Sequence, residues 1–231
     1  MHHTTDQPPL TPESAFDALY VSTVPGLTQQ AYVLTGCRRL AFESAEQAFH
    51  RAWEHWPEVA RDPDPVAWVR ARSHEYALSP WHRLRPGLYR PASLPADPVV
   101  RALQELPPWQ RRVALLCDGL DLSIEEAAAE TQATTAATAG RLRHARATIS
   151  RQMPGTDPDT RTRAETDTHT NAACHALRAR VKDASAATLA QPWSVRAASE
   201  RRARALTRAV LAATAVLIAL IAVTVAMTPD P

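Results

Sequence analysis

Residues that bind metals or form disulfides are scarce in this chain of 231 residues. The three cysteines, Cys37, Cys117 and Cys174, lie far apart in the sequence. Cys174 and His175, with His169 nearby, do not supply the ligands of a tetrahedral zinc site, and the nine histidines show no ligand spacing. The sequence therefore predicts no metal and no other cofactor.

Motifs that carry catalysis are also missing. The sequence has no Ser/His/Asp order, no Gly-rich phosphate loop and no pair of carboxylates in apolar surroundings. Only six glycines are present, and no segment shows the convincing apolar–polar alternation of a strand. The formal net charge is only +2, so the distribution of charge is more informative than its total. We predict an all-α protein that is not an enzyme.

A long apolar run lies near the C-terminus. Residues Ala209 to Met227 carry no charge and approach the ~20 residues that cross a bilayer as a helix. Five arginines precede the run: Arg196, Arg201, Arg202, Arg204 and Arg208. Asp230 is the only charge after it, so the positive-inside rule places the N-terminal bulk in the cytoplasm.

The first ten residues, MHHTTDQPPL, lack the apolar core and the cleavage site of a signal peptide. We therefore expect a single-pass protein of the inner or plasma membrane with cytoplasmic N-terminal domains. A cytoplasmic setting also argues against disulfides.

The remaining sequence divides by composition. Helical spacing of apolar residues predicts two helical domains, at residues 11–83 and 99–152. Residues 84–98 between them are rich in proline and form a linker that cannot continue a helix. Residues 153–208 are polar and then rich in Ala and Arg, which predicts a flexible, partly helical basic stalk. Residues 209–227 form the predicted transmembrane helix.

The third helix of the first domain combines basic and aromatic residues. Asp64 is its predicted N-cap, with Pro65 in the first position. The helix and its exit carry Trp68, Arg70, Arg72, His74, Tyr76, Trp81 and Arg83. Cations with interleaved aromatic rings suit a nucleic-acid strand, because phosphates pair with the cations and bases stack on the rings. A solvated basic face over core aromatics has the same composition, so both interpretations stay open.

The second domain ends in two helices joined by a tight turn. Ser123 and Glu126 have the spacing of a capping box at the start of the first of these helices. The second helix, from Thr134 to Gln152, is basic through Arg141, Arg143, His144, Arg146 and Arg151. This plan is that of a helix-turn-helix, in which the second helix enters the major groove. A generic basic helix is the alternative.

Taken in order, several short motifs resemble one protein family. They are Phe16-DALY, Leu34-TG, Phe42-ESAEQAFHRAW, Trp68-V, Leu106-PPWQRRVALL, Leu122-SIEEAA and Gly140-RLRHARATI. Over residues 14–152 the chain resembles an extracytoplasmic-function (ECF) RNA polymerase sigma factor. The resemblance implies a helical region 2 and a helix-turn-helix region 4 joined by a short linker.

The resemblance also implies partners and sites. Region 2 would bind core RNA polymerase and the −10 element of promoter DNA, and region 4 would bind the −35 element. The implied polymerase-binding residues are Glu43, Glu46, Phe49 and Trp53. The implied −10 residues are Trp68, Arg70, Arg72, His74, Tyr76, Trp81 and Arg83. The implied −35 residues are Thr135, Thr138, Arg141, Arg143, His144, Arg146 and Arg151. An anti-sigma or other regulatory protein is a further implied partner.

Some positions depart from the family pattern. Glu46 stands where the family usually has Gln, Glu75 where it has Asn, Gln132 where the turn has Gly, and Ala139 where the last helix has Lys. Two functions therefore stay open. The first is a membrane-tethered sigma factor that directs promoter-specific transcription initiation. The second is a degenerate, sigma-like, membrane-anchored interaction protein without promoter recognition.

Overall fold

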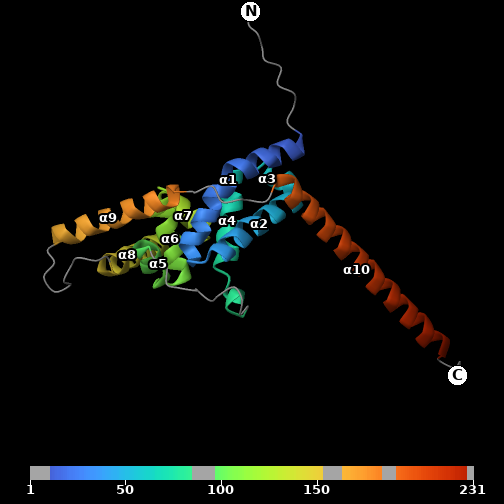
Figure 1. The fold of residues 1–231 in the computed structure, drawn as a ribbon. Coiled ribbons are helices and arrows are strands. Elements are labelled where there is room, and N and C mark those ends of the chain that lie inside the picture. Colours follow the sequence, from blue (N-terminus) through green and yellow to red (C-terminus); the bar gives the residue numbers. More distant parts are fainter. Residues whose placement is uncertain (1–10, 85–96, 153–162, 184–190, 228–231) are drawn as a thin grey trace, which may run out of the picture. The chain divides into compact units, whose positions relative to one another are not determined.

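The computed structural model describes residues 11–84, 97–152, 163–183 and 191–227, and its regular elements are all helical (Figure 1). These residues form ten α-helices, a short 3₁₀ helix (η1) and a short π-helix (η2), and they contain no strand. The predicted all-α class is therefore confirmed. The chain divides into two units, Met1–Leu189 and Ala190–Pro231, which are described separately below.

The first unit begins with a helical bundle, here called the first module. Its elements are α1 (Pro12–Thr35), α2 (Arg38–Glu54), α3 (Trp56–Val59), α4 (Pro65–Ala77) and η1 (Pro80–Leu84). The predicted N-cap at Asp64 is confirmed, and Thr11 caps α1 in the same way. The Thr11 side chain accepts a hydrogen bond from the Ser14 N–H at 3.2 Å, and the Asp64 side chain accepts one from the Ala67 N–H at 2.9 Å. Each cap satisfies an amide that has no partner within its helix.

An aromatic cluster fills the part of the first module between α1 and α2. The ring centroid of Phe49 lies 5.8 Å from that of Phe16 and 4.7 Å from that of Tyr20, both in edge-to-face geometry. Trp53 and Trp56 also lie against Phe16, with centroid distances of 5.1 and 5.4 Å. Edge-to-face pairs of this kind add to the gain from burial. The pattern of aromatic residues in α2 thus reflects a core.

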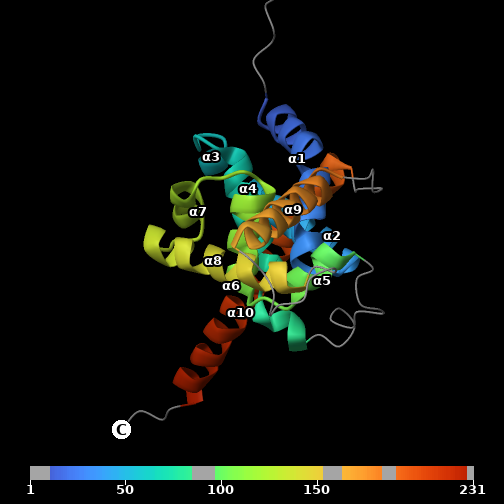
Figure 2. The same ribbon diagram turned by 90° about the vertical axis from the view of Figure 1, so that its left-hand side faces the viewer.

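The second module follows residues 85–96, which lie outside the described residues. Its elements are α5 (Pro98–Gln104), α6 (Pro108–Ala114), η2 (Leu115–Gly119), α7 (Ile124–Glu130) and α8 (Thr135–Gln152). A further helix, α9 (Arg163–Lys182), runs alongside α8 in Figures 1 and 2. The linker predicted at 84–98 and the stalk predicted at 153–208 stay predictions, because residues 85–96 and 153–162 are not described.

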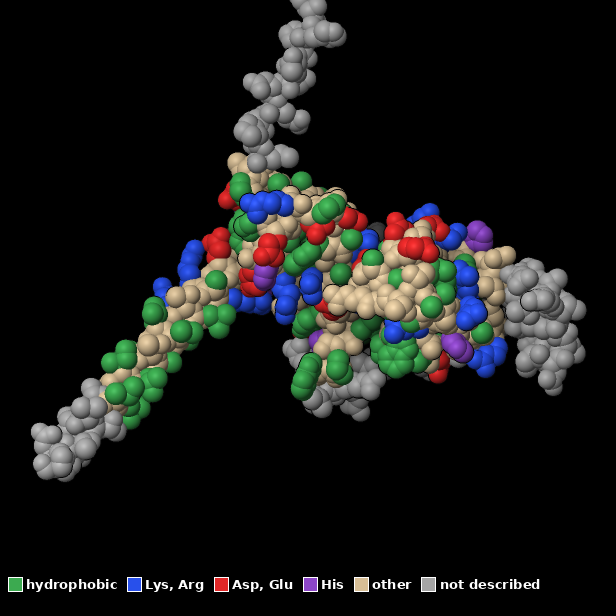
Figure 3. Space-filling model, turned by 180° about the vertical axis from the view of Figure 1, so that it is seen from behind, with side chains coloured by type: hydrophobic (Ala, Val, Ile, Leu, Met, Phe, Trp, Pro, Cys, Tyr) green, Lys and Arg blue, Asp and Glu red, His purple; other side chains and the backbone are tan. Residues whose placement is uncertain are grey.

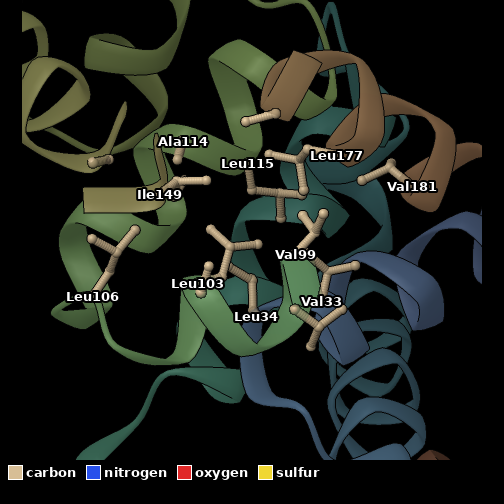
Figure 4. Packing of buried hydrophobic residues seen from close by; sticks show 14 residues of the cluster. Val33, Leu34, Val99, Leu103, Leu106, Ala114, Leu115, Ile149, Leu177 and Val181 are labelled. Carbon is tan, nitrogen blue, oxygen red and sulfur yellow. The ribbon is translucent and has the colours of Figure 1, made fainter. Parts of the chain in front are cut away.

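One hydrophobic core joins elements from both modules (Figure 4). Val33 and Leu34 enter it from the end of α1, and Leu103 and Leu115 enter it from α5 and η2. Helix α8 contributes Ala145 and Ile149, and α9 contributes Ala173, Leu177 and Val181. Because these residues are at most 6 % exposed, the two modules and α9 pack as parts of one unit.

The second unit contains one helix, α10 (Pro192–Met227). Its residues Pro192–Ile221 include an 18-residue window of mean hydropathy 1.8, none of it buried. In Figure 3 hydrophobic side chains cover the distal part of this helix, and Lys and Arg side chains lie nearer its start. By length and composition, α10 is the one candidate membrane span among the described residues.

Candidate nucleic-acid interface

Helices α7 and α8 form a helix-turn-helix in which each helix begins with a local capping contact. The capping box predicted at Ser123 and Glu126 is confirmed, with hydrogen bonds of 3.1 and 2.8 Å between the two residues. Gln132 in the turn has φ of 51°, in the left-handed region that favours glycine. The Thr134 hydroxyl then accepts a hydrogen bond from the Ala137 N–H at 3.2 Å, at the start of α8.

A small apolar cluster sets the orientation of α8 against the rest of the second module. Leu142 of α8 and Ala127 of α7 pack with Val113, Leu116 and Cys117. This packing buries one face of α8 and leaves the opposite face to solvent. The arrangement is that of a DNA-reading helix presented on a small helical support.

The solvent face of α8 carries part of the predicted −35 set. Arg143, His144 and Arg151 are exposed there, and Thr135 is exposed at the start of the helix. Arg141 is half-buried. Residues 143 and 144 lie four and three positions before residue 147, and residue 151 lies four after it, so the four share one face. Lys and Arg side chains also gather at the end of the first unit that holds α8 and α9 (Figure 3).

The remaining two residues of that set are less available to DNA, because Thr138 is buried and Arg146 is held in an ion pair. Thr138 is fully buried, so its hydroxyl is not accessible to DNA in this conformation. Arg146 forms a bidentate ion pair with Asp118 of η2, whose side chain is 3 % exposed, with N–O distances of 2.5 to 3.1 Å. The Asp118 carbonyl accepts a further hydrogen bond from Arg178 of α9 at 3.1 Å. Arg146 therefore holds α8 against η2.

Two thiols lie in the environment of Asp118. Burial, and to a lesser extent the nearby Asp118 carboxylate, raises the pKa of both Cys117 and Cys174 to about 11. At neutral pH both groups are thiols, which are weak nucleophiles and weak metal ligands.

In the first module, some of the predicted −10 residues lie at the surface. Trp81 is 70 % exposed, and the Arg72 guanidinium lies 5.4 Å from the centre of the Trp68 ring. Arg72 also pairs with Glu75 at 2.7 Å, so the acidic residue that would repel a DNA strand is already balanced by a cation. The side chain of Arg83, at the end of η1, lies outside the described residues.

Other −10 residues are engaged inside the first unit. Two N–H groups of Arg70 donate to the same carboxylate oxygen, Oε2, of Glu130 in α7, at 2.9 and 2.7 Å. His74 is fully buried and hydrogen-bonds with Gln30 at 3.1 Å. Burial, with the charges of Arg112 and Arg70, holds the pKa of His74 well below its usual value. At neutral pH His74 is therefore uncharged.

The predicted polymerase-binding residues are divided between surface and core. Glu46 is exposed and lies 3.3 Å from the His50 ring, whereas Phe49 is fully buried and Trp53 is half-buried. The Tyr76 hydroxyl donates to the Glu43 carboxylate at 2.5 Å and thereby joins α4 to α2. Burial, with a contribution from Glu46, raises the pKa of Tyr20 to about 12. Of the four residues, Glu46 is the one most accessible to a partner.

Sequence reasoning missed three residues that organise these surfaces. They are Arg111, Asp118 and Glu130, of which Arg111 and Asp118 are almost fully buried. The Glu130 side chain is 8 % exposed. A sequence signal exists for Glu130, because it is the last acid before the uninterrupted basic stretch of α8. Its partner Arg70 lies 60 residues away, so the pairing itself cannot be read from spacing.

The α7–turn–α8 arrangement defines the second module as a helix-turn-helix domain. Residues 96–149 match the family model for sigma-70, region 4, so this part of the chain is a sigma-70 region 4 domain. Such domains are typical of transcription factors that are not enzymes, and they indicate a sigma-factor-like DNA-binding role with promoter DNA as partner. No curated protein matches the chain.

Proposed function

We propose that this chain is a membrane-tethered sigma factor of the ECF type. In this proposal the first module binds core RNA polymerase and the −10 element, and α8 binds the −35 element. Helix α10 anchors the chain in the membrane with its N-terminal domains in the cytoplasm. The observation that carries the proposal is the exposed basic face of α8 within a region 4 domain.

The chemistry of that face supports DNA contact. The exposed side chains Arg143, His144 and Arg151 have no acidic neighbour on α8. Arginine binds phosphate oxygens and the major-groove edge of guanine in bidentate fashion. The first module supports strand contact more weakly, because Trp68, Arg72 and Trp81 reach the surface while Arg70 and His74 do not.

A double substitution tests the role of α8. We expect Arg143→Ala with Arg151→Ala to weaken duplex DNA binding by the full chain in detergent. The slope of log affinity against log salt concentration should flatten by about 2, because each lost phosphate contact contributes about 0.9. The measurement is a titration of labelled duplex at several salt concentrations.

Arg101→Ala is the matched control, since Arg101 is an exposed arginine of the same module that lies on α5. Its substitution should leave both the affinity and the salt slope nearly unchanged. Equal binding by the double variant and the wild-type chain would remove α8 from the interface and overturn the proposal.

One observation favours a second function: Arg70 and His74 are held by hydrogen bonds to Glu130 and Gln30 inside the first unit. If these hydrogen bonds are permanent, the chain is a sigma-like interaction protein that binds a partner at the membrane and does not recognise a promoter. Pull-down of the solubilised full chain distinguishes the two functions. The sigma factor should retain core RNA polymerase subunits and start transcripts with them, whereas the interaction protein should yield no promoter-dependent transcript.

A further inference from the structure

Helix α9 lies outside the residues that match region 4, which end at 149, yet it packs on the same domain. Its apolar residues Ala173, Leu177 and Val181 belong to the core in Figure 4, together with residues of η2, α5 and α8. Each of the three is at most 6 % exposed. Because they recur every four residues, they give α9 one apolar face, and its burial holds the helix on the domain.

The surface of η2 is shaped to accept α9. A Cβ at Gly119 of η2 would come within 3.5 Å of the side chains of both Leu177 and Val181. Glycine permits such a close approach, because it has no side chain to separate the two segments. The fit between η2 and α9 therefore depends on a residue that lies inside region 4.

Arg178 of α9 contacts both ends of the turn that leads from η2 to α7. Its Nε–H donates to the Asp118 carbonyl at 3.1 Å, and its guanidinium pairs with the Asp121 carboxylate. Asp121 has φ of 59°, in the left-handed region that residues with a side chain adopt rarely. The planar guanidinium can hold two acceptors in a fixed relation. Arg178 thus fixes the turn from which α7 begins.

The same helix also contacts α8. Asp118, whose carbonyl accepts from Arg178, receives the ion pair from Arg146 of α8 on its side chain. Nearer the end of α8, the hydroxyls of Ser150 and Thr170 are hydrogen-bonded at 3.0 Å. The face of α8 that carries Arg143 stays exposed with α9 in place. Helix α9 therefore supports α8 without covering its basic face.

We propose that α9 is an added helix of the region 4 domain that holds α7 and α8 in the geometry in which α8 binds DNA. Arg178 is its positioning residue, which acts on α7 through Asp121 and on α8 through Asp118 and does not contact DNA. Without Arg178 a smaller fraction of chains holds the binding geometry, and the apparent affinity for DNA falls in proportion. This role rests on the proposed function, because it concerns DNA binding by α8.

Arg178→Ala in the full chain in detergent tests the role of Arg178. We expect the affinity for duplex DNA to fall about fivefold, the effect of one ion pair and one hydrogen bond at a partly exposed site. The slope of log affinity against log salt concentration should stay the same, because no phosphate contact is lost. A slope lower by about 0.9 would mean that Arg178 contacts a phosphate itself, and would overturn the positioning role.

Lys182→Ala is the matched control, because Lys182 is an exposed cation of the same helix. It removes the same charge from α9 and should leave both the affinity and the salt slope unchanged. An equal loss of affinity in Lys182→Ala and Arg178→Ala would show an effect of net charge alone and would overturn the proposal.

A double-mutant cycle with Asp121 separates positioning from a general loss of stability. Asp121→Asn keeps a residue that tolerates the left-handed region, and it should weaken DNA binding although loss of an acid by charge alone would strengthen it. Arg178→Ala combined with Asp121→Asn should bind no more weakly than Arg178→Ala, because both changes remove the same contact. Additive losses would overturn the proposal.

Hydrogen exchange measures the positioning without DNA. Arg178→Ala should speed amide exchange in the turn before α7, in α7 and in α8, and leave α2 unchanged, because the lost contacts are local. Unchanged exchange in α7 and α8 would overturn the role of α9. If the wild-type chain binds no duplex DNA while Arg178→Ala shows the local change in exchange, the proposed function is refuted and the support of α7 and α8 by α9 stands.

Discussion

At the scale of single residues, the presence or absence of a buried acidic partner decides what each arginine does. Arg143 and Arg146 lie three residues apart on α8, yet Arg143 is exposed while Arg146 pairs with the buried Asp118. Arg70 and Arg72 differ in the same way on α4, since Arg70 pairs with Glu130 and Arg72 lies at the surface over Trp68. Residue type alone does not separate these roles.

The buried His74 makes stability depend on pH. Its pKa in the folded chain is lowered, first by burial and then by Arg112 and Arg70, while in the unfolded chain it stays near 6.5. Glu130 and Gln30 are its other polar neighbours. As pH falls below about 6.5, the unfolded state takes up a proton that the folded state does not, so stability is lost.

We therefore expect His74→Gln to be less sensitive to acid than the wild-type chain. The difference in the free energy of unfolding between His74→Gln and the wild-type chain should change by up to about 1.4 kcal/mol per pH unit below 6.5. Urea unfolding of the full chain in detergent at pH 7.5 and 5.5 measures it. The exposed His55→Gln is the control, and an equal acid response in all three chains would contradict a buried neutral His74.

At the scale of elements, the sequence predicted what depends on neighbouring residues. The caps predicted at Asp64 and Ser123 depend on contacts three residues away, and both are confirmed. The start of α8 at Thr135 follows from the same kind of local signal.

Contacts between distant segments could not be predicted in this way. The pairing of Arg70 with Glu130, and the capping of α1 by Arg111, join residues 60 and 77 apart in the sequence. Which of many arginines meets which acid depends on how the helices pack. The basic and aromatic pattern of α4 was for this reason compatible with both a DNA surface and an interior contact.

The turn between α7 and α8 gives a prediction at this scale. Gln132 has φ of 51°, which costs a residue with a side chain about 1 kcal/mol relative to glycine. Gln132→Gly should therefore raise the free energy of unfolding of the first unit by at most that amount. Glycine gives the unfolded chain more conformational entropy, and this offsets part of the gain. Denaturant midpoints measure the change, and Gln132→Asn should fall between the two. A destabilised glycine variant would contradict the strained turn.

At the scale of the whole molecule, the proposal joins a DNA-binding domain to a membrane anchor. The apolar part of α10 is long enough to span a bilayer and is preceded by arginines on one side. We expect fractionation to place the full chain in the membrane pellet. Truncation after Thr207 removes the apolar run and should move the chain to the soluble fraction.

Extraction controls distinguish a span from surface attachment. Carbonate or high salt should leave the full chain in the pellet, because an inserted helix is held by apolar burial and not by charge. Release of the chain by carbonate would rule out a membrane-spanning helix, and membrane anchoring would then be wrong as a part of the proposed function.

The central claim is that this chain directs RNA polymerase to promoters through α8. The most direct measurement maps the DNA bound by the full chain in cells that express it, together with transcript starts. We predict enrichment just upstream of a set of starts, lost in Arg143→Ala with Arg151→Ala and retained in Arg101→Ala. No enrichment upstream of any transcript, with polymerase bound to the chain, would contradict the claim.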